Sequence, residues 1–530
     1  MNQTPYTPNE RLIQSDVNVK FEDLLDMDEI TFRDWVMRMR KLVVEIWDEN
    51  GVPPRLGKSE DEIIDQFNKM TSYPVHEFTH GDELGVVNDD VIINKSRLGS
   101  EADQWFPNMY KTRINYSEKD TGYSIYDLFA NPKYEERMYK GCLRHFRRDS
   151  MYLHALSCQK VDEKTARIRV EDAMTFVRDF HKNPDIFRNC DFMLDQVKLS
   201  EGVNSGYNQV DSSKLLQLTS DQVQTLKDEG LLEYRHHSTF DISNMPNDKV
   251  YTVRLYRTGN RIFPKGFAAF RIGYIQPAVN FPPMTAKYLY ERFTEHIKDQ
   301  EVINIYDPSS GWGGRILGAM ACKDDRVIHY IGCDPNPDNY SDSDKRSRYA
   351  DLAHFYNTKT YRGNSFFSRT NTYEVYRVGS EEIKNIEEFQ KYKGKLDLVF
   401  TSPPYFNREA YSEDENQSFK KYGSSYESWR DGFLRPTLET AVGWLRKDRY
   451  LLWNIADIKV GDKYLPLQQD SINILNSLGM HYCYDLKMAM EGMPGQNRLD
   501  ENGKPSCKNY CKVNDKFLKY EPVLVFKKRK

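Results

Sequence analysis

From about residue 275 onward, the chain alternates between short, continuously apolar runs and longer polar stretches that are compatible with helices. Strands that are apolar throughout must be covered on both faces, so this alternation predicts an α/β fold with helices on both sides of a parallel sheet. Ligands of such sheets bind beyond the carboxyl ends of the strands. The apolar runs are Val302–Asp307, Val327–Asp334, Tyr373–Gly379, Leu396–Thr401, Asp448–Asp457 and Glu521–Lys528.

The first 270 residues have a different pattern of apolar and polar residues, which predicts a mixed, mainly helical region. Asp28–Gly51 has apolar residues at helical spacing and a terminal glycine, and Leu218–Leu232 is predicted to be a second capped helix. Lys249–Gly259 is rich in β-branched and aromatic residues, which is typical of a strand. We therefore expect a flexible N-terminus over 1–20, a mixed α+β region over 21–270 and the α/β domain over 271–530.

Composition excludes several classes of protein. No run of 18 apolar residues is present, so no membrane contact is expected. The N-terminus lacks an apolar signal core and the eight cysteines form no CxxC pair, so we expect a cytoplasmic protein without a metal site, in a bacterium or a phage-infected cell. The net charge of −4 gives no general attraction to nucleic acid, and local basic runs such as Arg144–Arg148 are more often solvated faces.

The first apolar run ends in a glycine-rich stretch, "DPSSGWGGR", at Asp307–Arg315. Glycines allow a tight turn and let a ligand approach the backbone closely. The second run ends on Asp334, twenty residues after Gly314. An acid at about this spacing from a glycine turn can accept hydrogen bonds from both hydroxyls of a ribose. An ordinary strand–helix turn explains the glycines alone equally well. Together with Asp334 they indicate a bound nucleoside, without distinguishing NAD from S-adenosylmethionine.

The fourth run ends in Ser402-Pro403-Pro404-Tyr405. Two successive prolines donate no hydrogen bond and stiffen the chain, so carbonyl oxygens are left as fixed acceptors. Ser402 adds another acceptor and Tyr405 adds a flat ring. Such a set suits an exocyclic amino group on a planar base, since acceptors that hold both protons aim the nitrogen lone pair at an electrophile. A rigid turn after a core strand is the alternative interpretation.

"DPSSGWGG", "GCDPNP", "TSPPY" and "EPVLVFKK" in this order resemble the amino-methyltransferases that modify DNA with S-adenosylmethionine. The resemblance covers roughly residues 275–530 and implies a Rossmann-like methyltransferase sheet. "TSPPY" is typical of the cytosine-N4 branch, whereas adenine-N6 enzymes more often carry Asp or Asn where Ser402 stands. Two departures concern the cofactor contacts: the family usually has Phe where Ser309 stands, and Thr or Ser where Gly314 stands.

The resemblance also implies roles for individual residues. Asp307, Gly311 and Gly313 would hold the methionine portion of the cofactor, and Asp334 its ribose. Asn280–Pro282 resembles the segment that closes over the methionine end. Ser380 or Glu381 would approach the adenine. The full implied set is Asp307, Pro308, Gly311, Gly313, Asp334, Ser380, Glu381, Asn280, Phe281 and Pro282 for the cofactor, and Ser402, Pro403, Pro404 and Tyr405 for catalysis.

The reaction implied is methyl transfer to an exocyclic amine of a base flipped out of double-stranded DNA, with Tyr405 replacing its stacking partner. Cytosine N4 is preferred and adenine N6 is the alternative. Methylation at carbon 5 is disfavoured, because it usually uses a Pro-Cys pair and this sequence contains none. A cognate restriction endonuclease is a further partner that the resemblance suggests.

Two readings from other classes stay open. A nicotinamide-dependent dehydrogenase explains the glycine turn and Asp334 but leaves "TSPPY" without a role. A catalytically inactive, DNA-binding relative fits the departures at Ser309 and Gly314. The region 21–270 is expected either to recognise DNA, together with the polar loop 411–428, or to act as a scaffold.

Overall fold

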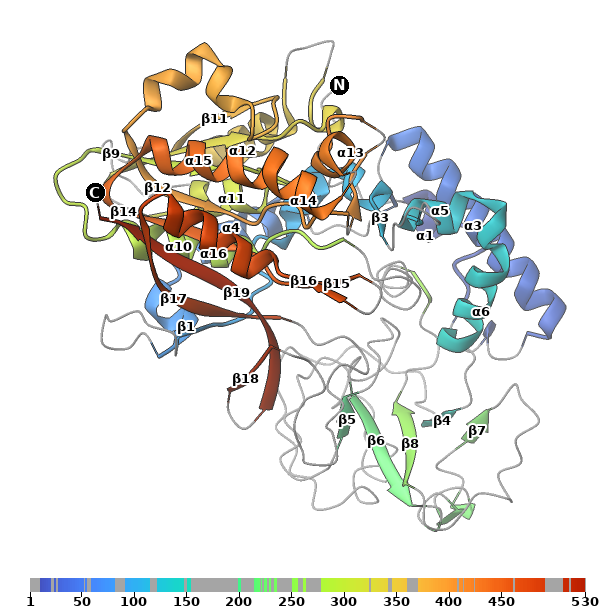
Figure 1. The fold of residues 1–530 in the computed structure, drawn as a ribbon. Coiled ribbons are helices and arrows are strands. Elements are labelled where there is room, and N and C mark those ends of the chain that lie inside the picture. The colour runs from blue at the N-terminus through green and yellow to red at the C-terminus, as the bar shows by residue number, and fades with distance from the viewer. Residues whose placement is uncertain are drawn as a thin grey trace. The chain divides into compact units, whose positions relative to one another are not determined.

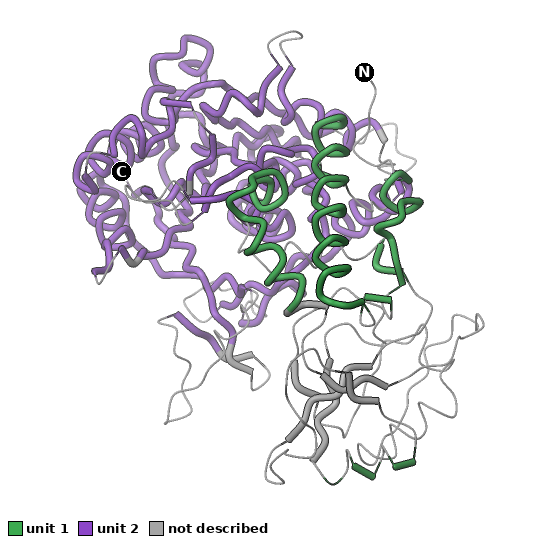
Figure 2. Tube along the Cα trace, turned by 90° about the vertical axis from the view of Figure 1, so that its right-hand side faces the viewer, with its two compact units in different colours: residues 1–57, 125–277 green, residues 58–124, 278–530 purple. Residues whose placement is uncertain are grey.

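The computed structural model describes residues 10–146, 278–490 and 509–529 apart from short gaps, and separated segments between 150 and 263. Its contacts divide the chain into two compact units, one formed by 1–57 with 125–277 and the other by 58–124 with 278–530 (Figure 2). This division differs from the expected one, because residues 58–124 belong with the C-terminal half. No helix among the described residues has both the length and the apolar character needed to cross a membrane.

The C-terminal unit is built on a ten-stranded sheet (Figure 1). Its order is β1-β2-β17-β19-β14-β12-β9-β10-β11, with β18 paired to β19. The strands are β1 Thr79–His80, β2 Ile92–Ile93, β9 Val302–Asp307, β10 Val327–Cys333, β11 Thr372–Tyr376, β12 Leu396–Thr401, β14 Leu445–Asn454, β17 Met480–Ala489, β18 Tyr510–Val513 and β19 Lys516–Lys528. The predicted α/β class with a Rossmann-like sheet in this half is confirmed.

The sheet has a parallel centre and an antiparallel edge. Strands β11, β10, β9, β12 and β14 are parallel neighbours, whereas β19 runs antiparallel between β14 and β17. After β9 the chain places β10 on one side of it and later places β12 on the other. The strand order therefore reverses between β9 and β12, and the carboxyl ends of these two strands form the topological switch point where ligands bind in open α/β sheets.

Helices cover both faces of the sheet, which explains why every residue of β12 is buried. On one face the ring of Phe400 contacts Tyr290 of α10. On the other, Val399 shares a core cluster with Leu438 of α15 and Ile474 of α16, the two helices that lie together in front of the sheet in Figure 1. The helices are α10 Pro283–Thr294, α11 Gly314–Met320, α12 Arg348–Lys359, α13 Ser418–Tyr422, α14 Tyr426–Trp429, η10 Arg430–Leu434, α15 Arg435–Trp444 and α16 Leu467–Ser477, with short turns η7 Pro337–Asn339, η8 Ile383–Asn385 and η9 Glu387–Tyr392.

The segment 58–124 joins this unit by pairing with strands far along the chain. Strand β2 runs parallel to β17, and β3 pairs with β13 directly after the "TSPPY" stretch. A further short hairpin, β15–β16, follows β14. The additional elements are α4 Glu60–Ser72, η1 Val75–Phe78, η2 Ser100–Trp105, η3 Pro107–Lys111, β3 Arg113–Ile114, β13 Glu409–Ala410, β15 Ile458–Val460 and β16 Lys463–Leu465.

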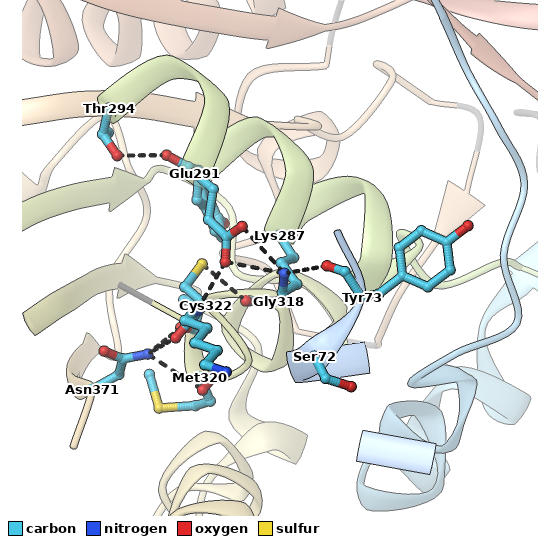
Figure 3. Close-up of polar contacts among 12 residues, drawn as sticks. Ser72, Tyr73, Lys287, Glu291, Thr294, Gly318, Met320, Cys322 and Asn371 are labelled. Atoms are coloured by element: carbon cyan, nitrogen blue, oxygen red, sulfur yellow. Dashed lines mark hydrogen bonds and ion pairs between the residues drawn. The ribbon is translucent and has the colours of Figure 1, made fainter. Parts of the chain in front are cut away.

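A buried polar network fastens this segment and α11 to the rest of the unit (Figure 3). Lys287 of α10 is almost fully buried, and its Nζ lies 3.1 Å from Glu291 Oε1 and donates to the Tyr73 carbonyl at 3.2 Å. At the far end of α11, Asn371 Nδ2 donates to the carbonyls of Ala319, Met320 and Cys322 at 2.9, 3.3 and 3.0 Å. Since helix ends leave carbonyls without partners, Asn371 acts as the C-terminal cap of α11.

The described residues of the N-terminal unit form α-helices and a small mixed sheet. The predicted helix Asp28–Gly51 is confirmed as α3, with the Asp28 side chain capping its start and Gly51 left-handed at its end. Strand β8 confirms the predicted strand at 249–259, and α1 lies within the expected flexible stretch 1–20. The elements are α1 Glu10–Gln14, α3 Glu29–Asn50, α5 Ile125–Ala130, η4 Pro132–Tyr134, α6 Glu135–Phe146, β4 Ser150–Leu153, β5 Leu199–Glu201, β6 Lys214–Thr219, β7 Glu233–Arg235 and β8 Val250–Leu255.

The predicted helix Leu218–Leu232 is wrong at its start, because Leu218 and Thr219 close strand β6, which pairs with β8. Pairing with a strand more than 30 residues away overrides the local helical pattern there. In the rest of that segment the described residues Asp221, Gln224, Thr225 and Asp228 are helical, and the residues between them lie outside the described part of the chain.

Candidate active site

The carboxyl ends of β9 and β12 are joined by one short hydrogen bond at the switch point. Thr401, the last residue of β12, donates from Oγ1 to Asp307 Oδ1 at 2.6 Å. Both side chains are fully buried. The contact fixes the start of the Ser402–Tyr405 stretch, here called the lip, beside the start of the glycine turn Pro308–Gly314.

Asp307 is the centre of a buried polar cluster. Its carboxylate also accepts hydrogen bonds from Arg315 Nε at 2.7 Å, from Tyr330 Oη at 2.6 Å and from the Ser309 amide at 3.1 Å. Arg315 is itself buried and neutralises the Asp307 charge. Both carboxylate oxygens are thus engaged by the protein, and the role that this structure gives Asp307 is to hold the turn. A direct contact with the methionine portion of a cofactor stays a prediction.

The glycine turn passes so close to its neighbours that side chains are excluded from it. Gly311 and Gly313 have φ of +60° and +79°, which favours glycine. A Cβ atom on Gly313 would lie 2.4 Å from Phe106 Cε2, and one on Gly314 would lie 2.1 Å from the carbonyl oxygen of Phe281. A Cβ on Gly311 would instead make only ordinary van der Waals contacts, the shortest at 3.5 Å from Arg315 Nη2. The turn is therefore tightly packed against Phe106 and Phe281 at Gly313 and Gly314, and less tightly packed at Gly311.

The segment Asn280–Pro282 lies against the glycine turn, and its closure over the methionine end of a cofactor stays a prediction. Asn280 Nδ2 donates to the Trp312 carbonyl at 2.7 Å, and its Oδ1 accepts from the Gly314 amide at 3.3 Å. Phe281 packs edge-on against Phe400 of β12, with ring centroids 5.2 Å apart. Pro282 precedes α10, whose first residue is also a proline with a φ suited to a helix start.

Asp334 lies at the end of β10 and reaches the same turn. Its carboxylate accepts from the Gly311 amide at 3.1 Å and from the Asn336 amide at 2.9 Å, and it stays half-buried. Burial raises the pKa of the Asp334 carboxyl to about 6, against the lowering effect of these two N–H donors. The predicted pairing of the glycine turn with a strand-end acid is therefore present, and the acid keeps exposed surface for a ligand.

Ser380 and Glu381 follow β11 at the same edge of the sheet, and both are buried. Ser380 Oγ lies 2.8 Å from Thr437 Oγ1 of α15. Glu381 Oε1 accepts from Lys421 Nζ at 3.3 Å and from Tyr422 Oη at 3.2 Å. The contacts of Glu381 hold the segment after β11 against α13, which lies in the polar loop 411–428. A contact of either residue with a bound adenine stays a prediction.

The lip lies at the surface of the edge rather than in the core. Pro403 is buried, whereas Ser402, Pro404 and Tyr405 are half-buried. Tyr405 Oη donates to the carbonyl of Asn454, at the end of β14, at 3.4 Å. The ring of Tyr405 rests on the margin of the core cluster.

Phe406, immediately after the lip, adopts a left-handed backbone conformation at φ +46°. This conformation is costly for a bulky side chain, and here its ring is held between Tyr426 and Trp429, at centroid distances of 5.9 and 5.8 Å. The aromatic anchor turns the chain sharply and so leaves the Tyr405 ring at the edge.

Three further residues of the site carry no local sequence signal. Asn108 Nδ2 donates to Asn339 Oδ1 at 2.9 Å, Asn339 donates to Tyr349 Oη at 2.9 Å, and Tyr349 donates to the Gly311 carbonyl at 2.5 Å. This relay connects residues 231 positions apart in the sequence, so one sequence alone could not reveal it. Arg315 could have been found, because a cation next to a glycine turn that follows a buried acid implies an ion pair.

No protein-family model and no curated protein sequence matches this chain. Solved structures that match include the CurJ carbon methyltransferase, at 11% identity over 47% of this chain and 54% of that one, with a TM-score of 0.27. A provisionally assigned DNA modification methylase from Thermus thermophilus, in complex with S-adenosyl-L-methionine, matches at 18% identity over 29% and 54%, with a TM-score of 0.19. TrmN from Thermus thermophilus matches at 11% over 46% and 48%, with a TM-score of 0.26.

The chain spans about half the length of these matched structures. At such TM-scores the matches carry no argument about the site. The α/β assignment rests on the strand order and register, and the chemistry rests on the residues gathered at the switch point.

Proposed function

We propose that this chain transfers a methyl group from S-adenosylmethionine to an exocyclic amine of a base in double-stranded DNA, with cytosine N4 preferred over adenine N6. The observation that carries the proposal is the hydrogen bond from Thr401 to Asp307, which ties the lip to the glycine turn at the switch point. A lip far from the turn could not serve a transfer between two bound groups, since reacting atoms must approach to about 3–3.5 Å.

The residues at the glycine turn fit a nucleoside cofactor. Gly311 is half-buried and has no neighbour closer to an added Cβ than 3.5 Å, and Asp334 presents a half-buried carboxylate next to it. In the proposal Asp334 accepts hydrogen bonds from the ribose hydroxyls, and the turn lets the rest of the ligand approach the backbone. The bound cofactor supplies a methyl group that is already activated on a sulfonium, so the protein has to provide alignment and polar stabilisation.

The residues of the lip fit a base amine. The Ser402 hydroxyl and the proline-stiffened carbonyls accept its protons and hold the nitrogen lone pair toward the methyl carbon, while the half-buried Tyr405 ring stacks on the base. The nitrogen then bonds to the methyl carbon as the sulfur–carbon bond breaks, and the nitrogen releases one proton to water. Serine at position 402 supports cytosine N4, because the adenine branch more often carries an acid or amide there.

Methyl transfer to defined duplexes, read by mass spectrometry of the released nucleosides, tests this proposal. We expect N4-methylcytosine from the native chain, and a loss of about 10-fold to 100-fold in rate for Tyr405→Ala, because stacking on an aromatic ring contributes about 1–3 kcal/mol per base. Tyr405→Phe keeps the ring and is the matched control, expected within a few-fold of the native rate. Ser402→Ala should lower the rate by about 10-fold, because that is the contribution of one hydrogen bond to a group that carries or develops charge.

N6-methyladenine as the sole product would overturn the base assignment and leave the reaction class intact. Preferential binding of NAD over S-adenosylmethionine at equilibrium would overturn the methyltransferase proposal. Equal rates for Tyr405→Ala and Tyr405→Phe would remove the stacking role from Tyr405.

Cofactor affinity is expected to depend on pH through Asp334. Its pKa, raised to about 6, means that the carboxylate is ionised above pH 6 and protonated below it. Because the ionised form is the better acceptor for ribose hydroxyls, the dissociation constant should rise by up to about tenfold per pH unit below pH 6. Isothermal titration of S-adenosylmethionine from pH 5 to 8 measures this dependence. Asp334→Asn should bind weakly at all these pH values, and a native chain with the same flat profile would contradict the role of Asp334.

A further inference from the structure

The turns η2 and η3, from the segment 58–124, pack directly around the glycine turn. Phe106, which lies between them, contacts the ring of Tyr349 in α12 at a centroid distance of 5.0 Å, and a Cβ on Gly313 would lie 2.4 Å from its Cε2 atom. Trp105, the last residue of η2, packs against Phe355 of the same helix at 5.3 Å. These two turns are therefore part of the wall of the candidate cofactor site.

Asn108, in η3, is hydrogen-bonded to the segment that follows Asp334. Its Nδ2 donates to Asn339 Oδ1 at 2.9 Å, and both side chains are buried. Asn339 Nδ2 donates in turn to Tyr349 Oη at 2.9 Å and to Asp334 Oδ1 at 3.5 Å. One amide group, that of Asn339, thus connects Asn108 with the carboxylate that would hold the ribose.

The contact with Asn108 fixes which way the Asn339 amide faces. An amide has an acceptor oxygen on one side and a donor nitrogen on the other, and a half-turn exchanges them. Because Asn108 donates to Oδ1, Nδ2 is directed toward Asp334. Without that donor the buried Oδ1 would be unpaired, which is costly, and a rotation would let it accept from Tyr349 Oη instead. The same rotation would turn Nδ2 away from Asp334.

The Asn108 amide uses only one of its two polar groups. Its Oδ1 atom is buried, and no donor within the described part of the chain reaches it. A buried amide oxygen without a hydrogen bond is less favourable for folding than an apolar side chain of similar size. An asparagine at this position is therefore explained better by what its Nδ2 does to Asn339 than by its contribution to stability.

We infer that Asn108 is a positioning residue of the cofactor site, which orients the Asn339 amide so that its N–H groups stabilise the ionised Asp334 carboxylate. The inference rests on the proposed function and extends it. It assigns a role in cofactor binding to η3, which lies in the region 21–270 that the sequence assigned to DNA recognition or to a scaffold. In this role Asn108 touches no ligand and acts through Asn339.

The other charged and titratable groups around Asp334 do not titrate between pH 5 and 8. They come from β9, β10, the segment after η7, α12 and the segment after β11, and are Asp307, Cys333, Tyr340, Tyr349 and Arg377. Asp307 is paired with Arg315, and Arg377 is a cation throughout this range. Burial raises the pKa of the cysteine and of both tyrosines well above their usual values, so these three stay neutral.

Titration of the full chain with S-adenosylmethionine from pH 5.5 to 8 tests the role of Asn108. Loss of an N–H donor raises the pKa of a carboxyl, so in Asn108→Leu the pH below which affinity falls should move up by about 0.5–1 unit from the native value of about 6. The dissociation constant should be about 2-fold to 5-fold above the native one at pH 6 and equal to it at pH 8. A purely structural loss would instead raise the dissociation constant by one factor at every pH.

Two further variants test whether Asn108 acts through Asn339. Asn339→Leu removes the donor itself and should shift the profile in the same direction. The double variant should shift it no further than Asn339→Leu alone, because the two residues act in one chain of contacts. Asn108→Asp keeps the size of the side chain but accepts a hydrogen bond instead of donating one, so it should shift the profile upward even if Asn108→Leu fails to fold.

Asn18→Leu is the matched control. Asn18 is also a buried asparagine, but it lies in the other compact unit, where it donates to the Ile13 carbonyl at 2.7 Å and accepts from the Phe263 amide at 2.8 Å. This variant should lose stability and keep the native pH profile of cofactor binding.

A native profile in the folded variants at position 108 would overturn the inference, as would a loss of affinity that is the same at every pH. A further shift in the double variant beyond that of Asn339→Leu would overturn it as well, because Asn108 would then act by another route. These outcomes leave the proposed function standing. If the native chain binds no S-adenosylmethionine at any pH, the proposed function fails and this inference fails with it.

Discussion

Gly314→Ala is expected to lower the free energy of unfolding by about 3 kcal/mol and to weaken cofactor binding severely, because overpacking against backbone atoms cannot be relieved by a rotamer change. The new Cβ would lie 2.1 Å from the Phe281 carbonyl oxygen and 2.8 Å from Asn280 Oδ1. Moving these neighbours would cost free energy, since Asn280 is hydrogen-bonded to the Trp312 carbonyl and Phe281 is packed against Phe400. Thermal unfolding and titration of S-adenosylmethionine measure the two effects.

Gly443→Ala is the matched control for this substitution. Gly443 lies on the exposed side of α15, and a Cβ added there meets nothing within 4 Å. Because alanine favours a helix over glycine by about 1 kcal/mol, this variant should be slightly more stable than the native chain. If Gly314→Ala behaved like Gly443→Ala in both measurements, the close approach of Asn280–Phe281 to the turn would not be required.

The same close approach explains a departure from the amino-methyltransferase pattern. A Thr or Ser at position 314 has no room in this chain, because the segment before α10 crosses directly over the backbone there. Glycine at position 314 is therefore what the packing of this chain requires.

Local patterns predicted the central strands, which are mostly buried. Val302–Asp307 and Leu396–Thr401 begin and end where β9 and β12 do, since a strand covered on both faces carries a continuous apolar signal. Strand β17 went unpredicted because its central residues are only half-buried. Strand β19 starts at Lys516 rather than Glu521, because pairing with β18 extends it, and such pairing has no local signature.

The residues of the candidate site also fall into a group that the sequence predicted and a group that it did not. The glycine turn, Asp334 and the lip are contiguous motifs at strand ends, and the topology alone brings strand ends to one edge. The structure gathers them there, together with Asn280. Phe106 and Asn108 come from a segment that the sequence assigned to another domain, and they reach the turn only through tertiary packing. A single sequence contains no record of that packing.

Removing Arg315 is expected to be the most damaging change outside the lip. Its guanidinium contacts Asp307 at 2.7 Å, donates to the Ser309 carbonyl and lies 5.5 Å from the centre of the Phe281 ring. Arg315→Met keeps the apolar stem but leaves the fully buried Asp307 carboxylate without its cation. Breaking a buried pair from one side costs about 3–5 kcal/mol, so the unfolding free energy should fall by that amount.

Arg346→Met provides the comparison for an exposed pair. Arg346 lies 2.7 Å from Asp351, with 62% of its side chain exposed, and such surface pairs contribute at most about 1 kcal/mol. The double variant Asp307→Asn with Arg315→Met should regain much of the stability lost by Arg315→Met, because no buried charge is then left alone. A full cycle of four unfolding curves gives the coupling free energy between the two residues.

Thr401→Val separates stability from function. It removes the hydroxyl that donates to Asp307 Oδ1 at 2.6 Å and keeps the shape of the side chain, so the lip loses its link to the glycine turn in a folded chain, and methyl transfer should fall. Asp307→Asn does not remove this link, because Thr401 and the Ser309 amide both donate to Oδ1 and an amide oxygen there still accepts both hydrogen bonds. If Thr401→Val were as active as the native chain, the bond from Thr401 to Asp307 would not be what aligns the two halves of the site, and the proposed function would lose the observation that carries it.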